Sequence, residues 1–258
     1  MAKRNANFSK VLRALQKELK GKNGKRNRTS IEEFADRGQT LIFDDLYEAA
    51  SSKETCEFIE TLVKNDLSEL AHRIINQLID VYPQAFAGNK KLGKALNSLI
   101  QNGEALYVFE VIESLTFGRQ SVGPSVASAS PALSSNDSIP STVQQLLESA
   151  HGEIAGLTLH RLAIHSPGEL ARNTKLGECL ASLAKGGQSQ KVEIILGLIL
   201  SKHKIDLAVN PSMGKSVYAD LKEFCDPEII GPIIAELNSV NQYKPKPSKQ
   251  HGYRMDRR

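Results

Sequence analysis

The stretch that decides the fold is Asn-Lys-Lys-Leu-Gly-Lys-Ala-Leu at residues 89–96, because its pattern returns twice further along the chain. It reads Asn-Thr-Lys-Leu-Gly-Glu-Cys-Leu at 173–180 and Asn-Pro-Ser-Met-Gly-Lys-Ser-Val at 210–217. Each copy has an apolar residue three positions before its Asn, and the first two copies also share a Pro six positions before it. An internal repeat of this kind is typical of a solenoid, in which each unit packs on its neighbours.

The repeated residues have a physical interpretation as a helix start. An Asn side chain can cap a helix through its carbonyl oxygen, and Pro211 would then occupy the first helical position. A Gly inside a helix costs about 1 kcal/mol relative to Ala. Its recurrence therefore predicts that a neighbouring backbone comes too close to admit a Cβ atom. The predicted structural repeat residues are Asn89, Gly93, Asn173, Gly177, Asn210 and Gly214.

A second apolar helix follows each copy, so the repeating unit is predicted to be a helical hairpin. These helices lie near 108–115, 192–199 and 230–237, and the pair Asp226-Pro227 begins the last of them. A fainter fourth copy starts at Gly38, and further helices are expected at 66–81 and 142–165. The predicted fold class is all-α, with irregular helical-hairpin repeats that form an α-solenoid or an orthogonal bundle, and with disordered basic tails.

A Ser-rich segment at 118–141 interrupts the repeats. It contains almost no charge and too little apolar surface to offset its ordering entropy, so we expect a linker or loop. An inert tether is favoured over a phosphorylated switch. The predicted organisation is a basic tail with an amphipathic helix at 1–29, a helical subdomain at 30–117, this linker, a helical repeat subdomain at 142–240 and a second basic tail at 241–258.

Charge is segregated along the chain. The first 29 residues carry ten Lys or Arg against one acid, or +9, and residues 241–258 carry six against one, or +5. Because the whole chain is at +4, residues 30–240 carry −10. Cationic tails of this kind attract the phosphates of nucleic acids. The alternative is that the tails are a localisation signal, such as the Lys and Arg run at 20–28.

The first tail also has an apolar stripe. Phe8, Leu12, Leu15 and Leu19 share one face of a predicted helix, flanked by cations. Packing of this stripe on the body, or its docking in a partner, is favoured over a membrane surface or a transit peptide.

No apolar run is long enough to span a bilayer and no secretory signal is evident, so we expect no integral membrane association and a cytoplasmic or nuclear location. Cys56, Cys179 and Cys225 are expected to be structural thiols.

Motifs for catalysis are incomplete. The spacing from Gly88 to Lys94 matches a phosphate loop, but Ala95 occupies the position of the Mg-binding hydroxyl residue, and the copy ending at Ser216 lacks its first Gly. His160 and His165 fall on different helix faces, without a Cys cluster nearby. We therefore predict no metal, no cofactor and no enzymatic activity.

The hairpin with a Gly before an apolar residue is loosely similar to the repeats of Pumilio-type RNA-binding proteins, over at most residues 80–238. The positions just after the Gly, where that family reads bases, carry no Arg or stacking aromatic in any of the three copies. The spacing between the apolar residue and the Gly is also one residue longer than in that family. We do not assign the chain to it.

The sequence thus predicts a non-enzymatic nucleic-acid-binding protein, with RNA favoured over DNA. Its tails would contact phosphates without base specificity, and its acidic helical body would bind protein or itself. The alternative is an α-solenoid adaptor between proteins whose tails serve localisation. The predicted nucleic-acid-binding residues are Lys3, Arg4, Lys10, Arg13, Lys17, Lys20, Lys22, Lys25, Arg26, Arg28, Lys244, Lys246, Lys249, Arg254, Arg257 and Arg258.

Overall fold

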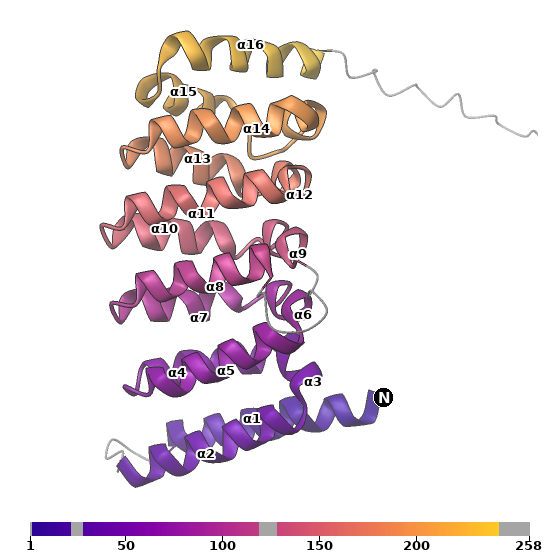
Figure 1. The fold of residues 1–258 in the computed structure, drawn as a ribbon, viewed down its shortest axis with the longest axis vertical. Coiled ribbons are helices and arrows are strands. Elements are labelled where there is room, and N and C mark those ends of the chain that lie inside the picture. The colour runs from indigo at the N-terminus through magenta and orange to yellow at the C-terminus, as the bar shows by residue number, and fades with distance from the viewer. Residues whose placement is uncertain (1, 22–27, 119–127, 243–258) are drawn as a thin grey trace, which may run out of the picture.

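A computed structural model describes residues 2–21, 28–118 and 128–242 of the chain. Within these ranges every regular element is a helix and no strand occurs, which confirms the all-α prediction. The helices stack in successive layers along one axis, with the N-terminal helix at one end and α16 at the other (Figure 1). Of the predicted basic tails at 1–29 and 241–258, residues 2–21, 28–29 and 241–242 lie in helices, and residues 1, 22–27 and 243–258 lie outside the described residues.

The repeating unit contains three helices in sequence, which we call short, middle and long. The short helices are α3 (Leu46–Ser51), α6 (Pro83–Ala87), α9 (Ser130–Ser134) and α12 (Pro167–Arg172). The middle helices are α4 (Lys53–Val63), α7 (Leu92–Gln101), α10 (Ile139–Glu148), α13 (Leu176–Lys185) and α15 (Lys215–Phe224). The long helices are α5 (Ser68–Val81), α8 (Ala105–Phe117), α11 (Gly152–His165), α14 (Ser189–Ala208) and α16 (Pro227–Gln242).

Two further features complete the architecture. Helix α14 is a long helix that continues into the short helix of the last unit across a kink at His203, where φ is −126°. Helices α1 (Ala2–Gly21) and α2 (Arg28–Asp44) precede the first unit and lie against it (Figure 1). The described chain therefore consists of an N-terminal helix pair followed by five stacked units.

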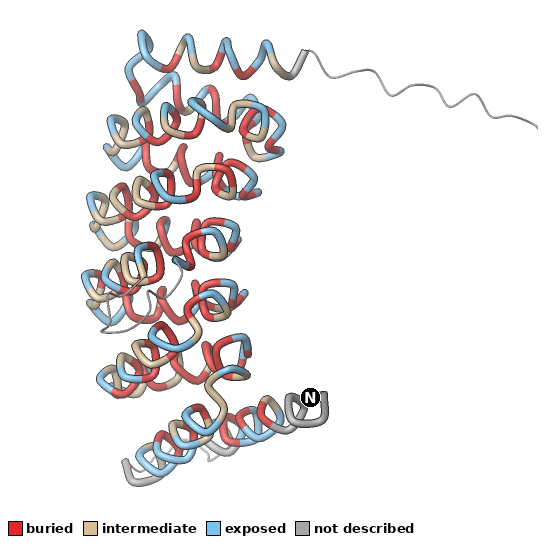
Figure 2. Tube along the Cα trace, turned by 45° about the vertical axis from the view of Figure 1, so that its right-hand side comes forward, coloured by how far each residue is buried: buried red, intermediate tan, exposed pale blue. Residues whose placement is uncertain are grey.

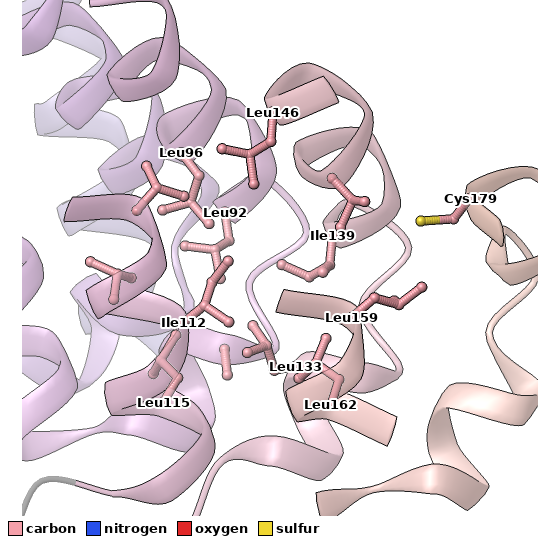
Figure 3. Packing of buried hydrophobic residues seen from close by; sticks show 14 of the residues in the cluster. Leu92, Leu96, Ile112, Leu115, Leu133, Ile139, Leu146, Leu159, Leu162 and Cys179 are labelled. Atoms are coloured by element: carbon pink, nitrogen blue, oxygen red, sulfur yellow. The ribbon is translucent and has the colours of Figure 1, made fainter. Parts of the chain in front are cut away.

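Helices of the same kind pack on one another from unit to unit, so the stack has three columns. Middle helices contact middle helices, long helices contact long helices and short helices contact short helices. Buried residues lie on the sides that face neighbouring helices, and exposed residues lie on the outer sides (Figure 2). Side chains of α7 and α8 meet those of α9, α10 and α11 in a close-packed interior (Figure 3). One apolar core thus runs through the described units, from Phe8 to Leu237.

An asparagine ladder joins the units. We use this name for Asn89, Asn136, Asn173 and Asn210, which are buried at the turn before each middle helix. Each side-chain Nδ2 donates to two backbone carbonyls of the preceding unit: Asn89 to Ala50 (3.0 Å) and Ser52 (2.9 Å), Asn136 to Ala87 (2.7 Å) and Asn89 (3.0 Å), Asn173 to Ser134 (2.9 Å) and Asn136 (3.4 Å), and Asn210 to Ala171 (2.6 Å) and Asn173 (2.8 Å). Ser52 stands at the equivalent position of the first unit, 37 residues before Asn89.

The role of these Asn residues differs from the predicted helix cap. Each Oδ1 accepts from the backbone N–H two residues later, as from Lys91 (3.0 Å) and Lys175 (3.0 Å), which closes a turn before the helix begins. Pro211 lies in this turn and not at the first helical position, since α15 starts at Lys215. The Asn is required because one amide can close its own turn and donate to the unit behind it.

The glycines mark the positions where the next unit approaches. A Cβ on Gly93 would lie 2.5 Å from the carbonyl oxygen of Ser138, and one on Gly177 would lie 2.7 Å from the carbonyl carbon of Ser212. The Gly N–H donates to the same Ser hydroxyl in each case, at 3.0 and 2.9 Å. The predicted close approach is confirmed at these two glycines. It does not occur at Gly214, where an added Cβ would have no described atom of another residue within 4 Å, its chain neighbours aside.

Part of the third unit lies in the segment expected to be a linker. Residues 128–141 contain helix α9, the ladder residue Asn136 and the start of α10, and only 119–127 lie outside the described residues. Pro140 stands where the other copies have Gly, and the opposing residue of the next unit is Lys175 instead of Ser. Pro140 has no N–H, so it cannot donate to a Ser hydroxyl across this interface as Gly93 and Gly177 do across theirs.

Two other helix predictions need correction. The helix expected at 142–165 is two helices, α10 and α11, separated by a turn at Ala150, where φ is +63°. Gly38, expected to begin a fourth copy, lies inside α2, where the ring of Phe58 packs against it. The helix expected at 66–81 is confirmed as α5, and Asp226 begins α16 by accepting from the N–H of Glu228 at 2.9 Å.

Candidate nucleic-acid interface

The basic N-terminal helix docks on the first unit through its apolar stripe. Phe8, Leu12 and Leu15 are buried in the common core, and α1 contacts α2, α3 and α4. The side chain of Leu19 is not among those described. The predicted packing of the stripe on the body is therefore confirmed for its first three members, and the opposite face of the helix is left to solvent.

Polar contacts from the same helix close the open end of the asparagine ladder. The Ser9 hydroxyl lies 3.2 Å from that of Ser52 and donates to Glu54 at 3.1 Å. Arg13 Nε donates to Glu54 Oε1 at 2.6 Å, and Gln16 Nε2 donates to the Glu54 carbonyl at 3.2 Å. Helix α1 thus binds the first unit at the place where a preceding unit would otherwise stack.

Glu54 is the centre of this contact. Its side chain is only 3% exposed, and burial alone would raise its pKa. Hydrogen bonds from Ser52, Arg13 and Ser9 outweigh the burial and hold the pKa of Glu54 below its ordinary value of 4.5. The carboxylate is therefore charged at neutral pH, and the Arg13 guanidinium offsets that charge locally.

Three of the predicted nucleic-acid-binding side chains lie in the described part of the chain. Lys10 and Lys17 are exposed one turn to either side of Arg13, and no ion pair engages them among the described residues. Arg13 is paired with Glu54 but keeps 56% of its side chain exposed. The backbones of Lys3, Arg4, Lys20 and Arg28 lie in α1 and α2, whereas their side chains, and the whole of the remaining predicted cations, lie outside the described residues.

A cationic groove lies directly beside this contact. We use this name for the open cavity of about 560 Å³ between the first two units, whose lining includes Lys53, Lys90, Lys91, Gln84 and Glu54. Sequence reasoning missed these lysines because the net charge of −10 over residues 30–240 hid a local run of like charge. The signal was nonetheless present in the neighbouring Lys90, Lys91 and Lys94.

The cysteine thiols of the described residues are buried. Burial raises the pKa of the Cys179 thiol to about 12, that of Cys225 to about 11, and that of Cys56 as well, so the buried thiols stay protonated. In the described ranges no group of three or more His, Cys, Asp or Glu side chains is placed to hold a metal ion. None of the described helices is both long and apolar enough to cross a membrane.

The fold and the ladder define the class of the protein as an α-helical repeat stack with a docked basic N-terminal helix. Comparisons extend this no further, because no known family model, curated protein or solved structure matches the chain.

Proposed function

We propose that this protein binds nucleic acid without catalysing a reaction, with RNA favoured over DNA. Its basic terminal segments hold phosphates as point charges, and its acidic helical body binds protein or a second copy of itself. The observation that carries the proposal is charge segregation: +9 in residues 1–29 and +5 in residues 241–258, against −10 between them.

The docking of α1 supports this assignment. The apolar stripe is buried in the core, so it is not available to a membrane or a partner. The exposed face of the helix carries Lys10 and Lys17. Only Arg13 among the described cations of this helix has its charge offset by an acid. A helix held rigidly by its other face presents these charges at lower entropic cost than a free tail does.

Neutralising the terminal cations should remove most of the salt dependence of RNA binding. The variant changes every predicted cation except Arg13 to Gln, which leaves the Glu54 contact and the apolar stripe intact. If the terminal cations contact about six phosphates, the log–log slope of affinity against salt for a single strand should be shallower by about 4 in the variant than in the original chain. Fluorescence anisotropy with a labelled RNA oligonucleotide measures both slopes.

The matched control changes the same Lys residues to Arg and the same Arg residues to Lys. Because it keeps every charge, it should keep the slope, and thermal unfolding by circular dichroism should show all three proteins folded. A Gln variant that binds RNA as the original chain does, with the same slope, would contradict the proposal.

A second candidate function is an adaptor between proteins, and one observation favours it. Ile164 on α11 and Ile194 on α14 are 43% and 47% exposed on two long helices that pack side by side. Sedimentation of the intact chain and of its Ile194→Asp variant with a basic peptide tests this candidate. Peptide binding that the variant loses, in a chain that binds no RNA, would favour the adaptor.

A further inference from the structure

We infer that the cationic groove is a binding site for the phosphate backbone of a single-stranded nucleic acid, and that it continues the basic face of α1 onto the helical body. This inference rests on the proposed function and extends it from the terminal segments to named residues of the first two units. It also assigns part of the acidic body to nucleic acid and not to protein.

The charge balance inside the groove carries the inference. Lys53, Lys90 and Lys91 line it, and none of the three is in an ion pair within the described part of the chain. Glu54 is the acid of the lining, and Arg13 and two Ser hydroxyls already bind its carboxylate. The groove therefore offers three uncompensated positive charges around one open cavity.

The surroundings of the groove extend this charge in two directions. Lys94 is exposed one helical turn beyond Lys91 on α7. On the other side Glu54 connects the groove to α1, where Lys10 and Lys17 flank Arg13. The run ends at the third unit, where Asp137 occupies the position of Lys90 and accepts from Thr174 at 3.1 Å. A basic path thus crosses α1 and the first two units and stops there.

The size and chemistry of the groove select the ligand. A cavity of about 560 Å³ is in the range of small-ligand pockets, so it admits a nucleotide of a flexible strand but not a duplex. Its lining carries no aromatic side chain on which a base could stack, and Gln84 is its one side-chain amide apart from the buried Asn89. Contacts are therefore to phosphate, with little base preference.

The test compares two triple variants of the intact chain. The groove variant is Lys53→Gln, Lys90→Gln and Lys91→Gln, and the matched control is Lys202→Gln, Lys215→Gln and Lys222→Gln. The control lysines are exposed, as Lys53 and Lys90 are, whereas Lys91 is half-buried. They are likewise free of ion pairs among the described residues, but they belong to the last two units. Both variants lose three positive charges, so the net charge of the protein is the same in each.

The readout is the affinity for a labelled single-stranded RNA oligonucleotide over a series of salt concentrations. The groove variant should have a log–log slope shallower by about 2, because three phosphate contacts are lost, while the control keeps the original slope. Restoring the charge with Lys53→Arg, Lys90→Arg and Lys91→Arg should restore the slope. Equal thermal unfolding midpoints for all variants would show that the substitutions act on binding.

The two possible failures are distinguishable. If the original chain binds RNA with a steep slope and the groove and control variants behave alike, the groove inference is wrong and the proposed function stands. If the original chain shows no salt-dependent RNA binding at all, both are wrong. A groove variant that loses affinity for phosphatidylserine vesicles but not for RNA would also overturn the inference, since the ligand would then be a lipid surface.

Discussion

Replacing Asn173 with Ala is expected to lower the free energy of unfolding by about 2–4 kcal/mol, because it breaks the asparagine ladder at the centre of the stack. The side chain is 3% exposed and makes three hydrogen bonds. It donates to the carbonyls of Ser134 and Asn136, and it accepts from the N–H of Lys175. The substitution removes the side-chain partner of the buried Ser134 carbonyl and of the Lys175 N–H, whereas the Asn136 carbonyl still accepts from the N–H of Ile139. A buried group left unpaired costs about 1–3 kcal/mol. Urea unfolding followed by circular dichroism measures the change.

The neighbouring Thr174 supplies a matched control. Its hydroxyl bonds to Asp137 at the surface, so Thr174→Ala should change stability by no more than about 0.5 kcal/mol. Asn173→Asp keeps the size of the side chain but turns an acceptor toward the two carbonyls, and should cost at least as much at pH 7. An Asn173→Ala protein as stable as the original would show that the ladder does not hold the units together.

Replacing Gly177 with Ala is the second substitution with a large expected effect, a destabilisation of about 1–3 kcal/mol. In an open helix the same change would stabilise by about 1 kcal/mol, so the predicted sign is opposite to helix propensity. The reason is that the new Cβ would lie 2.7 Å from the carbonyl carbon of Ser212, which is backbone and cannot rotate away. The change would also weaken the hydrogen bond from the Gly177 N–H to the Ser212 hydroxyl.

Two other glycines make this a controlled comparison. Gly214 has the same place in the repeat but no described neighbour within 4 Å, so Gly214→Ala should lie within about 0.5 kcal/mol of the original protein. Gly197 lies in the interior of α14 with equally open surroundings, and Gly197→Ala should stabilise by about 0.5–1 kcal/mol. If Gly177→Ala also stabilises, the close approach between units is not real.

The repeat was predictable from the sequence because Asn and Gly recur at a fixed separation for a physical reason. The Asn recurs because it bonds two units, and at Gly93 and Gly177 the next backbone leaves no room for a Cβ. The copy at Asn136 escaped detection because Pro140 replaces the Gly and an insertion at 119–127 lengthens the spacing from 37 to 47 residues. The first unit was not recognised as a copy of the repeat because Ser52 stands in place of Asn. Helix α1, and not a preceding unit, packs against it.

The candidate site was predictable only in part. Periodicity placed Phe8, Leu12 and Leu15 on one face of α1 and therefore Lys10 and Lys17 on the other. Nothing local in the sequence joins Arg13 to Glu54, which is 41 residues away, or Lys53 to Lys90 across two units. Those neighbours follow from the stacking of the units. As a result, the body has a net negative charge over residues 30–240 but a basic face at its N-terminal end.

This protein is proposed to hold phosphates by positive charge, and that proposal predicts how its RNA affinity depends on salt concentration. The intact chain should bind a single-stranded RNA of mixed sequence at about 50 mM salt, and the logarithm of its affinity should fall linearly with that of the salt concentration, with a slope of about −4 or steeper. An affinity that does not change between about 50 and 200 mM salt, or no binding at the lower concentration, would contradict the claim.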